Sequence, residues 1–304
     1  MISGVVDLGS NTIRLSIYQW ESGNFKLLLN KKEMAGLAGY VRDGSLSDAG
    51  ILTACRVLAG FRELLENFDI KDIHVFATAS LRNIVNTEEA LETIHRFTGV
   101  DVQVVTGAEE AQLSFRGASF HANRDGGLLA DIGGGSTELV SYEGDQILTG
   151  CSLPMGSLSL YSRFVSGLFP TDKERRAMRE FVEEELDRAK TEGLTCKHLC
   201  GVGGTIRAAG KLVNSLNGSE PDNRVHKAAD VRELYRLLKK GGKDALHRIL
   251  RIAPDRVHTM LPGLSILNAV VKAYEIETVT VSNTGVREGY LLERVMKGSA
   301  SHAG

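Results

Sequence analysis

Residues 5–15, VVDLGSNTIRL, and residues 129–139, LADIGGGSTEL, carry one pattern twice. Each copy has an apolar run, an Asp, a turn of Gly and small polar residues, and a second run of alternating character. This pattern predicts a β-hairpin with a tight loop. The repeat, with its two Asp residues in register, predicts two related domains, one for each copy.

Both loops are suited to holding phosphate oxygens. Gly lets the backbone approach a ligand closely and take positive φ angles, and successive N–H groups form an anion-binding nest. A carboxylate beside such a loop can orient a hydrated cation next to the phosphate. The alternative is two ordinary hairpin turns, which the repeated Asp argues against. The predicted phosphate-binding residues are Asp7, Gly9, Ser10, Asn11, Gly133, Gly134, Gly135 and Ser136.

Length and composition describe an ordinary globular protein. At 304 residues and 42% hydrophobic residues, the chain is long enough for two domains with their own cores. A formal net charge of −2 argues against a protein that coats nucleic acid. No signal peptide and no apolar run of membrane-spanning length is recognisable. We therefore expect a cytoplasmic protein with no nucleic-acid or membrane partner.

After each hairpin, strand and helix patterns alternate, which indicates an α/β fold. A polar stretch near 121–125 separates the two halves. We therefore place the domains at 1–122 and 123–304, with a return of the last helix, about 290–304, to the first domain left open. The predicted helices cover 47–68 (with Ser47 as N-cap), 87–98, a segment from about 108, 172–192, parts of 228–274, and 287–297; the predicted strands after the first hairpin cover 25–31, 73–77, 102–105, 146–151, 198–202 and 278–282.

Two motifs follow predicted strands of the first half, where α/β sheets place ligand-binding groups. Arg82 follows one strand, and its planar fork can hold phosphate bidentately. Glu109 and Glu110 open the helix after the next strand. Either carboxylate could orient or deprotonate an attacking water, or could only complement the helix dipole. The spacing does not choose between them.

The second half offers a metal pair and a third loop. Asp131 and Glu138 flank the second hairpin loop, and two carboxylates beside phosphate oxygens suit Mg²⁺. Residues 200–207, CGVGGTIR, read as strand, Gly turn and helix, so Gly203, Gly204 and Thr205 could receive an anion or a nucleoside. Between Arg224 and Arg251 basic residues outnumber acidic ones, which suits either a polyanion track or a solvated helix face.

Seven motifs occur in the order of the exopolyphosphatase and guanosine pentaphosphate phosphohydrolase (Ppx/GppA) family, which the chain resembles from about Val5 to Leu292. The resemblance implies an actin-like ATPase and sugar kinase fold, with two ribonuclease-H-like domains around a central cleft. It implies release of the terminal phosphate of inorganic polyphosphate, of guanosine pentaphosphate, or of both, and guanosine tetraphosphate as a further partner. The motifs are DLGSN (7–11), ATASLRN (77–83), GAEEA (107–111), DIGGGSTE (131–138), GVGGTIRA (201–208), LPGLSIL (261–267) and SNTGVREG (282–289).

The resemblance also implies roles for single residues. Arg82 resembles the phosphate-binding arginine, and Glu110 resembles the catalytic base. Asp131 and Glu138 resemble the carboxylates that organise Mg²⁺ and water.

Two departures from the family pattern stand out. Residues 256–258, Arg-Val-His, stand where the family often has Arg-Ala-Asp. The chain ends after the second domain, so we expect weak processivity on long substrates. Two rival interpretations stay open, an ATP-dependent small-molecule kinase of the same superfamily and a non-catalytic polyphosphate- or nucleotide-binding sensor. The choice between monomer and homodimer also stays open.

Overall fold

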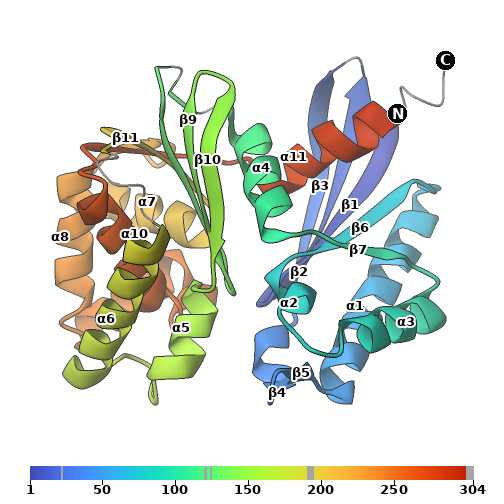
Figure 1. Ribbon diagram of the computed structural model, residues 1–304, viewed down its shortest axis with the longest axis horizontal. Coiled ribbons are helices and arrows are strands. Elements are labelled where there is room, and N and C mark those ends of the chain that lie inside the picture. Colours follow the sequence, from blue (N-terminus) through green and yellow to red (C-terminus); the bar gives the residue numbers. More distant parts are fainter. Residues whose placement is uncertain (22, 120–121, 124, 190–194, 299–304) are drawn as a thin grey trace. The chain divides into compact units, whose positions relative to one another are not determined.

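The structure is a computed structural model that describes residues 1–298 except 22, 120–121, 124 and 190–194. The chain divides into two compact units, Met1–Leu113 with the segment from Arg287 onward, and Ser114–Val286. Each unit combines a main β-sheet with helices (Figure 1). This confirms the predicted α/β class with two domains. The second unit begins within a helix, whereas the sequence placed the boundary in the polar stretch near residue 122.

The sheet of the first unit has the strand order β3-β2-β1-β6-β7. Strands β1 to β3 form an antiparallel meander, and β6 and β7 continue the sheet in parallel with β1. A separate small hairpin joins β4 and β5. The strands are β1 Ile2–Leu8, β2 Thr12–Glu21, β3 Asn24–Met34, β4 Val41–Arg42, β5 Ser45–Leu46, β6 Ile73–Ala77 and β7 Val102–Val104.

Helices cover both faces of this sheet. Gly4 of β1 has no side chain, and Leu65 of α1 occupies the space beside it. Ser16, which lies opposite Val5, accepts a hydrogen bond from Arg287 at 2.6 Å. Successive strand residues point to opposite faces, so α1 and α11 lie on opposite faces of the sheet (Figure 1). The helical segments are η1 Leu37–Tyr40, α1 Asp48–Asn67, α2 Ala79–Arg82, α3 Thr87–Thr98, α4 Gly107–Ala118, α11 Val286–Tyr290 and the π-helical η4 Leu291–Met296.

The sheet of the second unit repeats this arrangement. Its strand order is β10-β9-β8-β11-β13-β12, with an antiparallel meander followed by two parallel strands. Among the described strands of this sheet, the antiparallel edge strand β12 alone has no counterpart in the first sheet. The strands are β8 Gly127–Ile132, β9 Thr137–Glu143, β10 Gln146–Leu153, β11 His198–Val202, β12 Val225–Lys227 and β13 Thr278–Val281.

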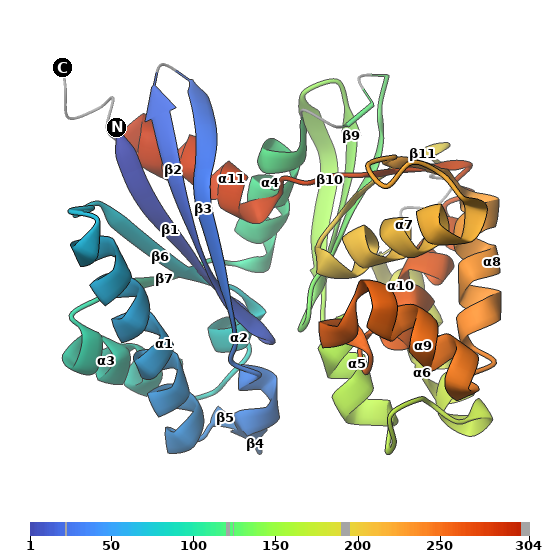
Figure 2. The same cartoon turned by 180° about the vertical axis from the view of Figure 1, so that it is seen from behind.

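Helix α10 is the centre of the helical layer of the second unit. It packs against α5, α6, α7 and α8, which explains why it is apolar on nearly all sides (Figure 2). No helix in the described part of the chain is both long enough and apolar enough to cross a bilayer. The helical segments are α5 Ser157–Phe164, α6 Asp172–Ala189, α7 Gly204–Asn217, α8 Ala228–Leu238, α9 Gly242–Ile252, η3 Pro254–Arg256 and α10 Met260–Ala273.

Most of the predicted elements are confirmed, several of them to the residue. The strand at 73–77 and the helix at 87–98 have the predicted bounds, and the helix at 47–68 differs by one residue at each end. Ser47 is the N-cap, but its side chain makes no capping hydrogen bond. The predicted end of the helix at 172–192 falls outside the described residues. The sequence missed the short elements α2, α5 and β12.

Helix α6 begins with a capping box. The Glu174 N–H donates to Thr171 Oγ1 at 3.3 Å, and the Thr171 N–H donates to Glu174 Oε2 at 2.7 Å. The N–H and hydroxyl of Ser166 donate to the other oxygen of the same carboxylate. These hydrogen bonds, with that of the Thr171 backbone first, lower the pKa of Glu174 to about 2.

We expect Glu174→Gln to destabilise the protein at neutral pH and to have little effect in acid. Because the folded state lowers this pKa, the stabilisation is present above the ordinary value of about 4.5 and is lost as the pH falls towards 2. Urea unfolding from pH 7 downwards should show the two proteins converging below about pH 4.5. Glu180→Gln, an exposed position on the same helix, is the matched control. A difference in stability between the two proteins that grows as the pH falls would contradict this account.

Candidate functional site

Both predicted hairpin loops are present, and they close with the same hydrogen bond. The Gly9 N–H donates to Thr12 O at 3.1 Å, and the Gly133 N–H donates to Ser136 O at 3.0 Å. A Cβ at Gly9 would lie 2.9 Å from Thr12 O, and one at Gly133 would lie 3.1 Å from Ser136 O. Neither glycine has a positive φ, so the prediction of positive φ angles is wrong for them. Close approach within the loop is what requires glycine.

Two carbonyls of the first loop are held by the start of η1 and its N-cap, Gly36. Ser10 O accepts a hydrogen bond from the Ala38 N–H at 3.0 Å, and Asn11 O accepts one from the Gly36 N–H at 2.9 Å. The loop is therefore fixed with two of its carbonyl groups directed at the protein.

The start of α5 holds the second loop in the same way. Gly133 O accepts from the Ser157 N–H at 2.9 Å, and Gly134 O accepts from the N–H groups of Leu158 and Ser159, both at 2.9 Å. A Cβ at Gly156 would overlap the carbonyl group of Gly134. Gly156 therefore permits the contact between α5 and this loop.

The backbone N–H groups of the two loops differ in their hydrogen bonding from the carbonyl groups, which accept hydrogen bonds from η1 and α5. In the described part of the chain, no acceptor receives the backbone N–H of Ser10, Asn11, Gly134, Gly135 or Ser136. Rows of amide donors on a fixed loop are an anion-binding arrangement. The structure thus gives each unit one loop with the chemistry predicted for a phosphate site.

The two Asp residues occupy equivalent positions with different neighbours. Asp7 lies directly opposite Arg14 in the β1/β2 pair, and Asp131 lies opposite Glu138 in the β8/β9 pair. Directly opposed residues of antiparallel strands share one face of the sheet. The second unit therefore places two carboxylates side by side, whereas the first places a carboxylate beside a guanidinium.

The carboxylate pair of the second unit is buried and oriented. Asp131 is 8% exposed and accepts a hydrogen bond from the hydroxyl of Ser114. Glu138 is 1% exposed and accepts one from Ser152 Oγ at 2.7 Å. Hard oxygen donors of this kind fit Mg²⁺, which usually takes one or two carboxylates and completes its shell with water and phosphate oxygens. Among the described residues, no group of three or more His, Cys, Asp or Glu side chains that could hold a metal is found.

The third predicted loop, at the start of α7, lies against Asp131 of the carboxylate pair. Gly203 has a φ of 95° and is the N-cap of α7. A Cβ there would lie 2.9 Å from Asp131 Oδ1 and 2.6 Å from Ile132 O. Both the backbone conformation and the space therefore require glycine, and the start of α7 lies against Asp131.

Thr205, in the first turn of α7, has different surroundings from those predicted. It is 1% exposed, and a Cβ at Gly263 of α10 would lie 3.0 Å from its Oγ1. Its hydroxyl therefore lies against α10. That hydroxyl has no hydrogen-bond partner in the part of the chain that the structure describes.

Arg82 and Glu110, which the sequence assigned to different roles, are in direct contact. Arg82 Nη1 lies 2.6 Å from Glu110 Oε2 and also donates to Val105 O at 3.2 Å. The two side chains are only 17% and 9% exposed. The ion pair fixes the orientation of the Glu110 carboxylate.

Glu109 has a separate role. Its Oε2 accepts hydrogen bonds from the N–H and the hydroxyl of Thr106, both at 2.9 Å, and its Oε1 lies 2.6 Å from Arg294 Nη2. The hydrogen bond from the Thr106 backbone is the main reason why the pKa of Glu109 is lowered. Glu109 is thus the capping residue of α4, which leaves Glu110 as the inward-facing carboxylate.

The sequence analysis missed the serines that hold the carboxylates and the glycine that seats α5. Ser114 follows Glu110 by one helical turn on α4, so a polar residue on the same helix face as Glu110 was a usable signal. No signal in the sequence pointed to Ser152 or Gly156, because their contacts depend on how β10 and α5 return to the second loop.

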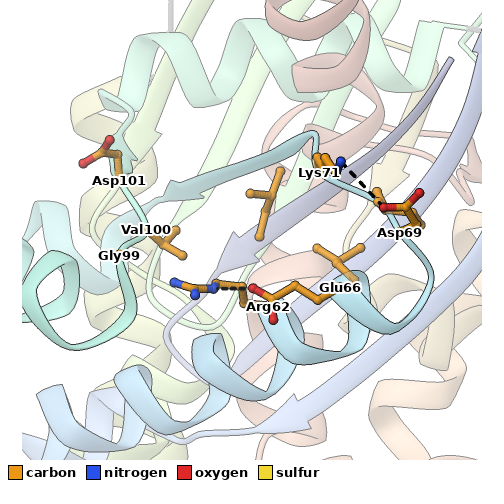
Figure 3. Close-up of a pocket in the computed structure, with 10 residues that line it drawn as sticks. Arg62, Glu66, Asp69, Lys71, Gly99, Val100 and Asp101 are labelled. Carbon is orange, nitrogen blue, oxygen red and sulfur yellow. Dashed lines mark hydrogen bonds and ion pairs between the residues drawn. The ribbon is translucent and has the colours of Figure 1, made fainter.

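A cavity of about 620 Å³ in the first unit contains none of the predicted site residues. It lies between the end of α1 and the turn after α3 (Figure 3). Four of its charged groups form two ion pairs, Arg62 with Glu66 at 2.8 Å and Lys71 with Asp69 at 3.8 Å, and the fifth, Asp101, lies 2.8 Å from His95 Nδ1. We therefore do not assign it to the candidate site.

The fold and loops define an α/β protein with two sheet-and-helix units, each carrying a glycine loop suited to phosphate. The chain belongs to the Ppx/GppA phosphatase family, whose model matches residues 16–297. It is 27% identical to the Aquifex aeolicus member of that family, with 98% of each chain covered and a TM-score of 0.80. These matches confirm the predicted family.

Two more distant crystal structures share the fold. An exopolyphosphatase from Cytophaga hutchinsonii is 24% identical, with 96% of this chain and 98% of that chain covered and a TM-score of 0.85. A nucleoside triphosphate hydrolase structure from Neospora caninum is 11% identical, with 98% and 93% covered and a TM-score of 0.58.

Proposed function

We propose that this chain is a phosphohydrolase that releases the terminal phosphate of inorganic polyphosphate, of guanosine pentaphosphate, or of both, by attack of water. The observation that carries the proposal is the pair of equivalent glycine loops, in which the backbone N–H groups of Ser10, Asn11, Gly134, Gly135 and Ser136 have no acceptor in the described structure. Membership of a phosphatase family and the name of the Cytophaga hutchinsonii relative support the same reaction class. Anionic substrates of this kind suit loops with several backbone N–H donors.

In the proposed reaction, Glu110 orients the water and accepts its proton. The water oxygen bonds to the terminal phosphorus as the anhydride P–O bond breaks, and the electron pair stays on the bridging oxygen of the leaving chain. The Glu110 carboxylate is buried and oriented by its ion pair with Arg82, so it is well placed for this task.

Arg82 serves both the base and the phosphoryl group in this proposal. Arg82 Nη1 donates to Glu110 Oε2 and to Val105 O. A planar guanidinium also suits phosphate oxygens, so the proposal gives Arg82 both tasks. The amides of the two loops stabilise the remaining negative charge.

Asp131 and Glu138 are the residues that would hold Mg²⁺. Bound there, the ion would offset negative charge on the transferred phosphoryl group. Ser114 and Ser152 orient the two carboxylates, and Gly203 keeps the start of α7 close enough to Asp131 for both to act on one phosphate.

A kinase of the same superfamily is the second candidate. A cavity of about 270 Å³ beside α7, lined among others by Arg207, Lys211 and Arg224, could accept the nucleoside part of a nucleotide. The kinase would transfer a phosphoryl group to an acceptor hydroxyl, and phosphate release without an acceptor counts against it.

The experiment that tests the proposal compares four substrates side by side, with and without Mg²⁺: tripolyphosphate, long-chain polyphosphate, guanosine pentaphosphate and ATP. We expect release of orthophosphate from at least one of the first three without any added acceptor. Binding of these compounds without release would support a sensor. Phosphate transfer only in the presence of a hydroxyl acceptor would support the kinase.

The basic residues of α8 and α9 give a prediction about substrate length. Lys239, Lys240 and Lys243 are exposed, so they can attract a long polyanion by charge alone. Changing all three to Gln should weaken the binding of long polyphosphate and flatten its salt dependence. Tripolyphosphate cleavage should change little.

Lys173, Lys197 and Lys272, three exposed lysines elsewhere in the same unit, provide the matched triple control. If the α8/α9 triple variant loses activity equally on long and short substrates, or on neither, this segment is only a solvated surface.

A further inference from the structure

Ser80, in the four-residue helix α2, links that helix to the end of β1. Its side chain is buried, with 6% exposed, and its hydroxyl donates a hydrogen bond to the carbonyl of Leu8. Leu8 is the last residue of β1 and directly precedes the first glycine loop. Because β1 and β6 are parallel neighbours with Leu8 opposite Ala77, this hydrogen bond lies where the loop and α2 leave the sheet.

The accepting carbonyl belongs to the first peptide group of the loop, whose N–H is that of Gly9. The Gly9 N–H donates to Thr12 O at 3.1 Å. A peptide group is planar, so hydrogen bonds at its oxygen and at its nitrogen together fix its orientation. Ser80 thus adds a third fixed carbonyl to the two that η1 and its N-cap hold.

The same helix carries Arg82 as its last residue. Thr87 Oγ1 donates to Leu81 O at 2.7 Å and to Ile84 O at 2.9 Å. A single helical turn is unstable by itself, so side-chain hydrogen bonds of this kind determine where its backbone lies. Ser80 and Thr87, one on each side in the sequence, therefore fix the backbone from which the Arg82 guanidinium extends.

The segment after α2 is attached to a different part of the unit. The side-chain amide of Asn86 pairs with the N–H and the carbonyl of Leu46, at 2.9 and 3.0 Å, and the Val85 N–H donates to Gly44 O at 2.9 Å. These contacts tie the segment to the β4–β5 hairpin. The Ser80 hydroxyl, in contrast, ties α2 to the glycine loop itself.

We infer that Ser80 is a positioning residue that keeps Arg82 and the first glycine loop at a fixed separation, so that one phosphate group of the substrate contacts both. The inference rests on the proposed function and names the side chain that joins two parts of the phosphate site. Donors on separate segments act on one phosphate group only while the distance between the segments is kept. Ser80 itself does not touch the substrate in this account.

The test measures tripolyphosphate binding by calorimetry in a Glu110→Gln chain, which leaves the substrate intact. Ser80→Ala should raise the dissociation constant about 5- to 20-fold, because the loop and the guanidinium no longer act on one phosphate group. Ser80→Cys, whose thiol is a weak donor of similar size, should give an intermediate value. In the active chain, kcat/KM for tripolyphosphate should fall in the same order.

Coupling to Arg82 separates a positioning residue from a structural one. In an Arg82→Gln background there is no guanidinium to position, so Ser80→Ala should raise the dissociation constant by less than about threefold. A residue that only stabilises the fold would weaken binding equally in both backgrounds. Equal losses would therefore overturn the inference.

Ser3→Ala is the matched control, because Ser3 lies on β1 of the same sheet, is fully buried, and donates a hydrogen bond to the carboxylate of Asp72. This variant should lower the urea midpoint and leave tripolyphosphate binding unchanged. A binding loss in Ser3→Ala as large as that in Ser80→Ala would also overturn the inference. If the unmodified protein releases no phosphate from any substrate, the proposed function itself fails. If it is active and Ser80→Ala binds and turns over like it, only this inference fails.

Discussion

Replacing Glu110 with Gln is expected to lower the turnover number by about 10²- to 10⁴-fold while changing substrate binding little, because the amide keeps the shape of the side chain and cannot accept the proton of water. A Gln side-chain oxygen can still accept the hydrogen bond from Arg82, so the fold around position 110 should persist. Steady-state kinetics on tripolyphosphate, together with calorimetric binding, separate the two effects.

Glu109→Gln is the matched control, since the two residues are adjacent on α4. Glu109 caps the helix and pairs with Arg294, so its loss should lower stability and cost less than about tenfold in turnover. Equal losses in the two variants, or full activity in Glu110→Gln, would show that Glu110 is not the base.

Asp131→Asn is expected to raise the Mg²⁺ concentration needed for half-maximal activity by at least about 10-fold and to lower the maximal rate as well. The change removes one of two buried carboxylates that share a face of the sheet, and Asn is a weaker ligand for a hard cation.

A magnesium titration at saturating substrate measures both quantities. Asp145→Asn, in the exposed turn between β9 and β10, is the control and should behave like the unmodified protein. If Asp131→Asn lowers the maximal rate but leaves the Mg²⁺ concentration for half-maximal activity unchanged, Asp131 has a structural role.

The repeated hairpins could be predicted from the sequence because their signals are local. Alternating side chains and a short glycine turn determine a hairpin without reference to the rest of the chain. The same holds for the long helices, whose apolar spacing predicted α1 and α3 within one residue at each end. The capping box of α4 was also readable, since Thr106 precedes Glu109 by the characteristic three residues, but it was not recognised.

The contacts that join distant segments could not be predicted in this way. Arg82 and Glu110 are 28 residues apart, and their ion pair depends on α2 and α4 beginning at neighbouring strand ends. The hydrogen bond from Ser80 to Leu8 O spans 72 residues and depends on β1 and β6 being neighbours in the sheet. The boundary between the two units fell in α4 and not in the polar stretch, because Ser114 hydrogen bonds to Asp131 of β8.

The central claim is that water attacks the terminal phosphorus, and turnover in ¹⁸O-labelled water tests it most directly. Mass spectrometry of the products from tripolyphosphate should find one labelled oxygen in the released orthophosphate and none in the remaining pyrophosphate. Label in the pyrophosphate, or orthophosphate released without label, would contradict the account.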